Sequence, residues 1–189
     1  MTSTKEILML CGSLRSGSSN SALMRTAMTL IPAGFSAHYY DDMDKLPHFN
    51  PDNDHDPLPA AVTALRARIA KSAAILICTP EYAGALPGSF KNLLDWTVGG
   101  VEIEKPTAWI NVSPSSTMAA NAHASLRLVL TYTGARIIED ACAHVPVLSS
   151  MIDEHGLVAD DDVRHEVARS LATLVGHSAH IESTVQVYI

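Results

Sequence analysis

The sequence has few cysteines, few aromatic side chains and no long hydrophobic stretch. Its three cysteines, at positions 11, 78 and 142 of 189, lie far apart and form no Cys-x-x-Cys pair. This spacing is typical of a reducing compartment, so we expect a cytoplasmic protein. No apolar run approaches the roughly 20 residues that cross a bilayer, and the apolar run 7–11 is too short for a signal peptide, so we expect no membrane partner.

Basic residues are also scarce and scattered. Lys and Arg number 13 against 20 Asp and Glu, which gives a formal net charge of −7. Nucleic-acid binding requires clustered basic side chains, so we expect no nucleic-acid partner. The hydrophobic share of 47% and the charged share of 17% are those of an ordinary globular chain. The length fits one domain spanning residues 1–189.

Short apolar runs alternate with longer amphipathic segments along the chain. We expect strands at 7–11, 35–40, 73–78, 107–112 and 136–138, and helices at 20–30, 60–71, 89–98, 119–132 and 161–175. A proline-rich surface loop is expected at 44–59. This alternation predicts an α/β fold, a flavodoxin-like three-layer sandwich around a five-stranded parallel sheet of order 2-1-3-4-5. Cys11 and Cys78 fall in apolar runs and fit core positions.

Ligands of open parallel sheets bind beyond the carboxyl ends of the strands, so the turns there carry the functional signal. The turn 12–20 reads Gly-Ser-Leu-Arg-Ser-Gly-Ser-Ser-Asn. Its glycines allow a tight turn, its hydroxyls form hydrogen bonds, and Arg15 adds a fixed charge in front of a helix N-terminus. The pattern predicts a phosphate cradle, although a serine-rich turn with an N-cap would also explain it. It is neither a Walker loop nor the dinucleotide fingerprint.

Two further turns could complete a site. Residues 79–96 read Thr-Pro-Glu-Tyr-Ala-Gly-Ala-Leu-Pro-Gly-Ser-Phe-Lys-Asn-Leu-Leu-Asp-Trp. Their prolines stiffen the chain and their glycines let backbone approach a flat heterocycle, while a plain strand-to-helix connection is the alternative. Residues 113–117, Ser-Pro-Ser-Ser-Thr, could add hydroxyls to a pocket wall, or form only a turn.

The first two turns resemble the two signatures of the NADPH-dependent FMN reductase family. The first signature is carried by Gly12–Arg15 with Ser18 and Asn20. The second is carried by Pro80-Glu-Tyr82, Pro87-Gly88, Lys91-Asn92 and Asp95-Trp96. The similarity continues through Ser113-Pro114 to Leu126-Arg127, so it covers roughly residues 5–140. That family includes bacterial quinone, chromate and azo-dye reductases.

The resemblance implies an enzyme with FMN as cofactor and NADPH or NADH as co-substrate. Hydride would pass through flavin N5 to a small-molecule oxidant such as a quinone, an azo compound, a metal oxyanion or free flavin. This chemistry belongs to the cofactor, so we expect no catalytic side chain. The phosphate would be held by Ser13, Arg15, Ser18, Ser19 and Asn20. The ring would be bordered, mostly through backbone, by Pro80, Glu81, Tyr82, Ala83 and Gly84, with Ser113 at its other edge.

The resemblance also implies self-association, because family members often dimerise through the helix that here holds Lys91–Trp96. We expect a homodimer or homotetramer, although Trp96 on an apolar helix face also fits a core position. The nine histidines fall into no convincing ligand spacing, and we expect no metal site.

One segment departs from the family pattern. Similar sequences usually carry Ser-Pro-Gly-x-x-Gly-Gly after the fourth strand, whereas here Ser115, Met118 and Ala119 replace the glycines. These side chains are expected to narrow the space beside the ring. Two other functions stay open: a flavodoxin-like one-electron carrier, which the 5% aromatic content disfavours, and a non-catalytic protein that binds FMN or another phosphorylated ligand.

Overall fold

The computed structural model describes residues 4–99 and 103–185. Its sheet has the order β2-β1-β3-β4-β5 with every strand pair parallel, which confirms the predicted flavodoxin-like topology. The strands are β1 (Lys5–Cys11), β2 (Phe35–Tyr40), β3 (Ala74–Cys78), β4 (Pro106–Asn111), β5 (Arg136–Ile137) and β6 (Ala143–His144). The α-helices are α1 (Ser19–Met28), α2 (Ala60–Lys71), α3 (Gly88–Asp95), α4 (Ala120–Tyr132) and α5 (Asp161–Val185).

The fifth position of the sheet differs from the single strand that the sequence predicts. β5 pairs with the start of β4, and β6 pairs with its end. Between them, Glu139–Ala141 form a short 3-10 turn whose Ala141 is fully buried. The turn moves the backbone out of hydrogen-bonding reach of the middle of β4, so the fifth strand is divided into two short pieces.

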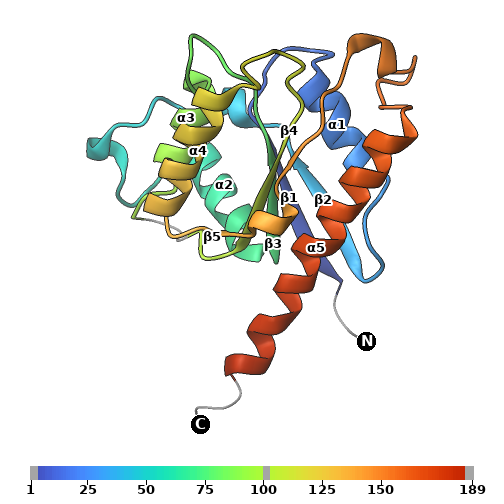
Figure 1. Ribbon diagram of the computed structural model, residues 1–189. Coiled ribbons are helices and arrows are strands. Elements are labelled where there is room, and N and C mark those ends of the chain that lie inside the picture. The colour runs from blue at the N-terminus through green and yellow to red at the C-terminus, as the bar shows by residue number, and fades with distance from the viewer. Residues whose placement is uncertain (1–3, 100–102, 186–189) are drawn as a thin grey trace.

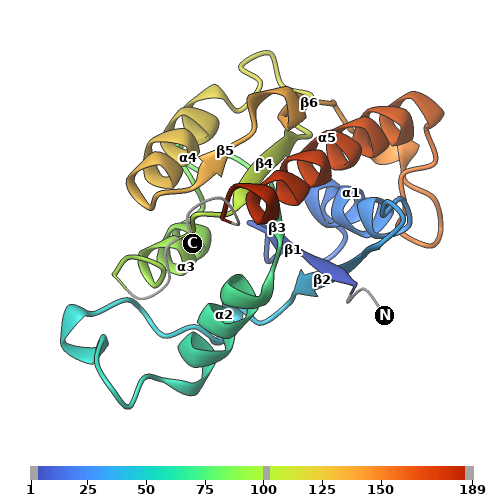
Figure 2. The same ribbon diagram turned by 90° about the horizontal axis from the view of Figure 1, so that it is seen from below.

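Helices cover both faces of the sheet, as Figures 1 and 2 show. Successive side chains of a strand point to opposite faces. Ile7, Met9 and Cys11 therefore join the apolar layer beneath α1 and α5. Leu8 and Leu10 join the layer beneath α2, α3 and α4. Burial on both faces explains why β1 is a continuous apolar run, and Figure 1 shows the end of α5 extending beyond the sheet.

The expected proline-rich loop is held against α3 by two side chains of the second signature. Asn92 Nδ2 and Trp96 Nε1 both donate hydrogen bonds to the carbonyl of Pro47, at 2.9 and 2.8 Å. Phe49 meets the Trp96 ring edge-on at 5.0 Å between centroids. Trp96 has no exposed surface, which confirms the core interpretation. These signature residues therefore anchor the chain's own loop.

The parallel arrangement places the carboxyl ends of the strands at one edge of the sheet. The turns that follow β1, β3 and β4 gather at the top of Figure 1. Among the residues described, no helix is both long enough and apolar enough to cross a membrane.

Candidate functional site

The turns after β1 and β3 are in direct contact at the base of the site. The Gly12 amide donates a 2.9 Å hydrogen bond to the carbonyl of Cys78. A Cβ at Gly12 would lie 2.1 Å from Thr79 Oγ1, far inside van der Waals contact. Only glycine allows this approach, which places the serine-rich turn beside the proline-stiffened one.

Ser18 has a structural role at the start of α1. Its hydroxyl accepts a 3.1 Å hydrogen bond from the amide of Ser21, which is an N-cap interaction, and only 2% of the residue is exposed. The alternative that we weighed for this turn, an N-cap, therefore applies to Ser18. The neighbouring Arg15 is exposed, and its guanidinium has no ion-pair or hydrogen-bond partner within 4–99 and 103–185.

A cavity of about 310 Å³ lies where the three turns meet. Six of the predicted site residues line it: Arg15, Ser19, Asn20, Pro80, Glu81 and Ser113. The other five do not: Ser13, Ser18, Tyr82, Ala83 and Gly84. The wall is completed by Thr79, Val112, Pro114, Ser115, Thr117 and Ala119. The structure therefore brings the two signatures and the turn after β4 into one cleft.

Asn20 is oriented by a buried contact underneath the cavity. The Cys78 thiol lies 3.2 Å from Asn20 Oδ1. Burial raises the pKa of Cys78 well above its usual range, so the thiol stays protonated and donates this hydrogen bond. With its oxygen engaged below, Asn20 can direct its amide N–H groups to the cavity that it lines. Cys11 and Cys78 are both buried, as expected.

Tyr82–Ala85 form a tight hairpin beyond the cavity. The backbones of Tyr82 and Ala85 exchange hydrogen bonds of 3.0 and 3.1 Å. Ala83 and Gly84 between them have φ of 51° and 71°, as the favoured two-residue hairpin turn requires. Because the Tyr82 amide is engaged within the hairpin, it is not free for a ligand. Gly84 fits its conformation without strain, whereas Ala83 does not.

The turn after β4 keeps a glycine-like backbone although it lacks the glycines. Met118 and Ala119 have φ of 52° and 49°, in the left-handed region. Asn111 stabilises this turn, since its Nδ2 donates to the Met118 carbonyl at 2.6 Å and its Oδ1 accepts from the Ser113 amide at 3.0 Å. Met118 is half exposed and does not line the cavity, so only Ser115 and Ala119 narrow it, in part correcting the expectation.

Glu81 connects the turn after β3 to α4. Its Oε2 accepts a 3.0 Å hydrogen bond from the amide of Ala122, in the first turn of that helix. The N-cap residue, Ala119, has no side-chain oxygen to do this. The carboxylate also lies at the positive end of the helix dipole. Glu81 therefore serves as the cap of α4 from across the cleft, which a motif comparison alone does not reveal.

Two histidines form hydrogen bonds with backbone carbonyls of the turn after β4. His144 Nε2 lies 2.8 Å from the Ser113 carbonyl, and His123 Nδ1 lies 3.0 Å from the Ala119 carbonyl. Because a carbonyl only accepts, each of these ring nitrogens carries a hydrogen. Burial lowers the pKa of His123, and the nearby His144 lowers it further, against opposing effects of the Ala119 carbonyl and Glu81. His123 is therefore a neutral ring near pH 7, with its Nε2 buried and unpartnered.

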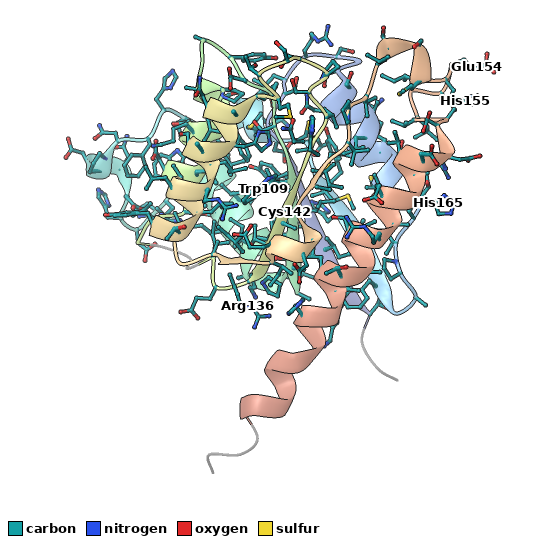
Figure 3. All side chains as sticks on the ribbon, viewed as in Figure 1. Trp109, Arg136, Cys142, Glu154, His155 and His165 are labelled. Carbon is teal, nitrogen blue, oxygen red and sulfur yellow. The ribbon has the colours of Figure 1, made fainter. Side chains whose placement is uncertain are left out.

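Histidines elsewhere do not extend this cluster. Figure 3 shows His155 on the loop beyond β6 and His165 on α5, at the edge of the molecule and away from Trp109 and Cys142. Within the part of the chain that the structure describes, no group of three or more His, Cys, Asp or Glu side chains could hold a metal ion.

An open parallel sheet with a hydroxyl-rich cleft at its carboxyl edge is the architecture of flavodoxin-like nucleotide-binding proteins. Comparison with known sequences then gives the family. The chain belongs to the NADPH-dependent FMN reductase family, whose profile matches residues 6–147. This match extends over both signatures and the turn after β4, as the resemblance of the motifs predicted.

Individual relatives agree with this assignment over nearly the whole chain. An NAD(P)H-dependent FMN reductase of Pseudomonas aeruginosa is 30% identical over 92% of this chain and 95% of its own length. A 2-hydroxy-1,4-benzoquinone reductase of a Burkholderia species is 32% identical over 84% of this chain and 88% of its own. Among solved structures, the flavoenzyme NAD(P)H:acceptor oxidoreductase FerB of Paracoccus denitrificans has a TM-score of 0.78 at 30% identity, covering 92% of this chain and 98% of that one.

Proposed function

We propose that this protein is an FMN-dependent NAD(P)H oxidoreductase that reduces small acceptors, with quinones as the first class to test. The observation that carries the proposal is the cavity where the turns after β1, β3 and β4 meet. Its lining brings an unpaired arginine and a helix N-terminus together with a turn that is stiffened by prolines. Family membership and the quinone-reducing relatives support the same function.

The residues at one end of the cavity fit a phosphate monoester. Arg15 supplies the charge, Ser19 lies in the first turn of α1, and Asn20 has its amide N–H groups available. Hydrogen bonds to a charged oxygen contribute roughly 1.5–3 kcal/mol each, so three or four of them could hold FMN by its phosphate. Ser18, as the N-cap, would maintain the position of these donors.

The other end fits a flat heterocycle. Pro80 and Glu81 form one side, and a row of hydroxyls forms the other. Ser113 Oγ lies 2.9 Å from Ser115 Oγ, which lies 3.1 Å from Thr117 Oγ1. Hydroxyls both donate and accept, so this row can match the alternating acceptors and donor along the edge of a flavin ring.

When bound, FMN supplies the hydride-transfer chemistry. The protein's part is to hold the phosphate, to orient the ring against the hydroxyl row and to leave one ring face open to substrates. None of these tasks needs a proton to move on a side chain.

The visible spectrum of the purified protein, recorded without oxygen before and after NADPH, tests this function. We expect flavin absorbance bands that bleach on addition of NADPH and return on addition of a benzoquinone. A protein that stays colourless after incubation with FMN would refute the proposal. Bound FMN that NADPH fails to bleach would instead favour the one-electron carrier. Against that alternative, no aromatic side chain is among the described residues lining the cavity to sandwich the ring.

We also propose that the protein works as a homo-oligomer in the cytoplasm. Support for association comes from α4, where Leu128 and Tyr132 are 73% and 80% exposed on one helix face. On α3 and directly after it, the side chains of Asn92 and Trp96 already anchor the Pro47 loop, which leaves α4 as the better candidate for the interface. The three cysteines are free, which suits a reducing compartment.

A further inference from the structure

The turn after β4 covers residues 113–119 and is held by three side chains from three different elements. Each side chain donates a hydrogen bond to one backbone carbonyl of the turn: Asn111 of β4 to Met118 at 2.6 Å, His123 of α4 to Ala119 at 3.0 Å, and His144 of β6 to Ser113 at 2.8 Å. None of these three donors is among the residues that line the cavity of the site. The three carbonyls are therefore engaged behind the wall, on the side away from the cavity.

The same turn leaves two backbone amides of the cavity wall without a partner. Within residues 4–99 and 103–185, the amides of Thr117 and Ala119 form no hydrogen bond, whereas the Met118 amide bonds to the Ser115 carbonyl. Both Thr117 and Ala119 line the cavity, and Ala119 is only 3% exposed. Buried backbone amides in proteins nearly always have a partner. An unpaired amide at Ala119 therefore points to a ligand that accepts hydrogen bonds.

The wall formed by this turn is poor in free negative groups. Among the described residues that line the cavity, Glu81 has the one carboxylate, and its Oε2 already accepts the hydrogen bond from the Ala122 amide. The two free amides stand directly before α4, at the positive end of its dipole. The wall therefore favours a ligand edge that carries acceptors, and it favours that edge more strongly when negative charge collects there.

We propose that Asn111, His123 and His144 are positioning residues that set the reduction potential of the flavin. The inference rests on the proposed function, because it takes the cavity to hold FMN. By engaging three carbonyls from behind, these residues present the amides of Thr117 and Ala119 to the pyrimidine edge of the ring. Reduction by hydride places negative charge at that edge, on N1 and the adjacent carbonyl oxygen. Two amide donors stabilise this charge more than they stabilise the neutral oxidised ring, so the three residues raise the potential.

The three donors do not contribute equally. Asn111 is 7% exposed, so its bond is shielded from water, and its Oδ1 also holds the Ser113 amide. Burial lowers the pKa of His123, so this ring is neutral near pH 7 and acts as a donor rather than as a charge. His144 is exposed, and water can take its place at the carbonyl. The effect on the flavin should therefore decrease from Asn111 through His123 to His144.

His165 offers a matched control for His123. Its Nδ1 lies 3.1 Å from the Asp161 carbonyl in the first turn of α5, a contact between residues four apart like that of His123 with Ala119. Figure 3 shows His165 at the edge of the molecule, and it does not line the cavity. FMN affinity, measured by quenching of flavin fluorescence, should fall roughly 2- to 10-fold in His123→Ala and stay parental in His165→Ala. His123→Asn keeps a donor near the position of Nδ1 and should recover most of the affinity.

The midpoint potential of bound FMN is a readout that a merely structural role would not move. General loosening of the site would weaken the oxidised and the reduced flavin alike, whereas misplaced amides should weaken the reduced flavin more. A tenfold difference between the two losses corresponds to a fall of about 30 mV for the two-electron couple. We expect a lower potential in Asn111→Ala and His123→Ala, a smaller fall in His144→Ala, and the parental value in His165→Ala. His144→Gln keeps a donor near the position of Nε2 and should restore the potential.

These measurements separate the proposal from the proposed function. If FMN binds and is bleached by NADPH, but His123→Ala and His144→Ala keep the parental potential, the proposal is overturned while the function stands. An equal fall of the potential in His165→Ala would overturn it as well. If the parent protein takes up no FMN, the proposed function fails and this inference fails with it. Asn111 is buried, so Asn111→Ala can fail to fold, and the two histidine variants then carry the test.

Discussion

The Ala122 amide donates a hydrogen bond to Glu81 across the cleft. We therefore predict that Glu81, on the turn after β3, holds the facing wall, formed by the turn before α4, in position. The amide belongs to the first turn of α4, where Ala119 cannot cap. Loss of a helix cap costs about 0.5–2 kcal/mol, and loss of a negative charge at the positive end of a helix adds about 0.3–1 kcal/mol. Glu81→Ala should therefore destabilise the fold by about 1–3 kcal/mol, or roughly 2–12 °C in thermal midpoint for a chain of this size.

Loss of the Glu81 hydrogen bond should also weaken FMN binding. Met118 and Ala119 are held in a left-handed conformation that costs about 1–2 kcal/mol per residue. Without Glu81, a relaxed conformation of this turn competes with the left-handed conformation that lines the cavity. If the competent turn loses about 1–2 kcal/mol, the cap energy, apparent FMN affinity falls by up to roughly 5- to 30-fold.

The matched control is Asp160→Ala. Asp160 Oδ1 accepts a 3.1 Å hydrogen bond from the Val163 amide at the start of α5, and Asp160 does not line the cavity of the site. Both variants remove a carboxylate from a helix N-terminus, so both should lower the midpoint, but only Glu81→Ala should weaken FMN binding, measured by quenching of flavin fluorescence. Glu81→Gln keeps an oxygen acceptor and should recover most of the affinity. Equal FMN affinity in the two alanine variants would refute a positioning role.

Three further predictions concern other parts of the site. Arg15→Ala should weaken FMN binding roughly 10- to 100-fold, and parental affinity in a fluorescence titration would remove Arg15 from the phosphate site. Ala83→Gly should stabilise the protein by roughly 0.5–1 kcal/mol in urea unfolding, because glycine relieves the strain at φ 51°, whereas Ala64→Gly inside α2 should destabilise it. The pKa of His123 is lowered by folding, so the unfolded chain binds the proton more readily and stability should fall as pH drops below about 6.5. His123→Gln should flatten this fall in thermal midpoint, and a parental pH profile would show that another group causes it.

The sequence predicts the fold well because two central strands are buried on both faces and so appear as apolar runs. These runs are Ile7–Cys11 and Ala74–Cys78, and the signals between them place the turns correctly. The division of the last strand is not predictable in this way. Two pieces of two residues each carry no periodicity, and their pairing depends on β4.

The site is only partly predictable, for a different physical reason. A motif identifies residues but does not separate a ligand contact from a structural one. The Ser18 hydroxyl is a group that commonly binds phosphate, yet in this structure it serves as an N-cap. Asn92 and Trp96 lie in a signature, yet both anchor Pro47, which lies more than 40 residues earlier in the chain. Contacts between distant segments, such as that of Glu81 with α4, require the folded backbone.

The contact between Gly12 and Thr79 limits how this cleft can change. A Cβ at position 12 would lie 2.1 Å from the Thr79 hydroxyl and 3.2 Å from the Phe90 ring, so any larger residue there would have to displace both side chains. A single substitution at position 12 is therefore not expected to be tolerated unless a smaller residue replaces Thr79 at the same time. The rim of the cavity is more tolerant, because Ser115 and Thr117 are exposed and can be exchanged without disturbing the sheet beneath.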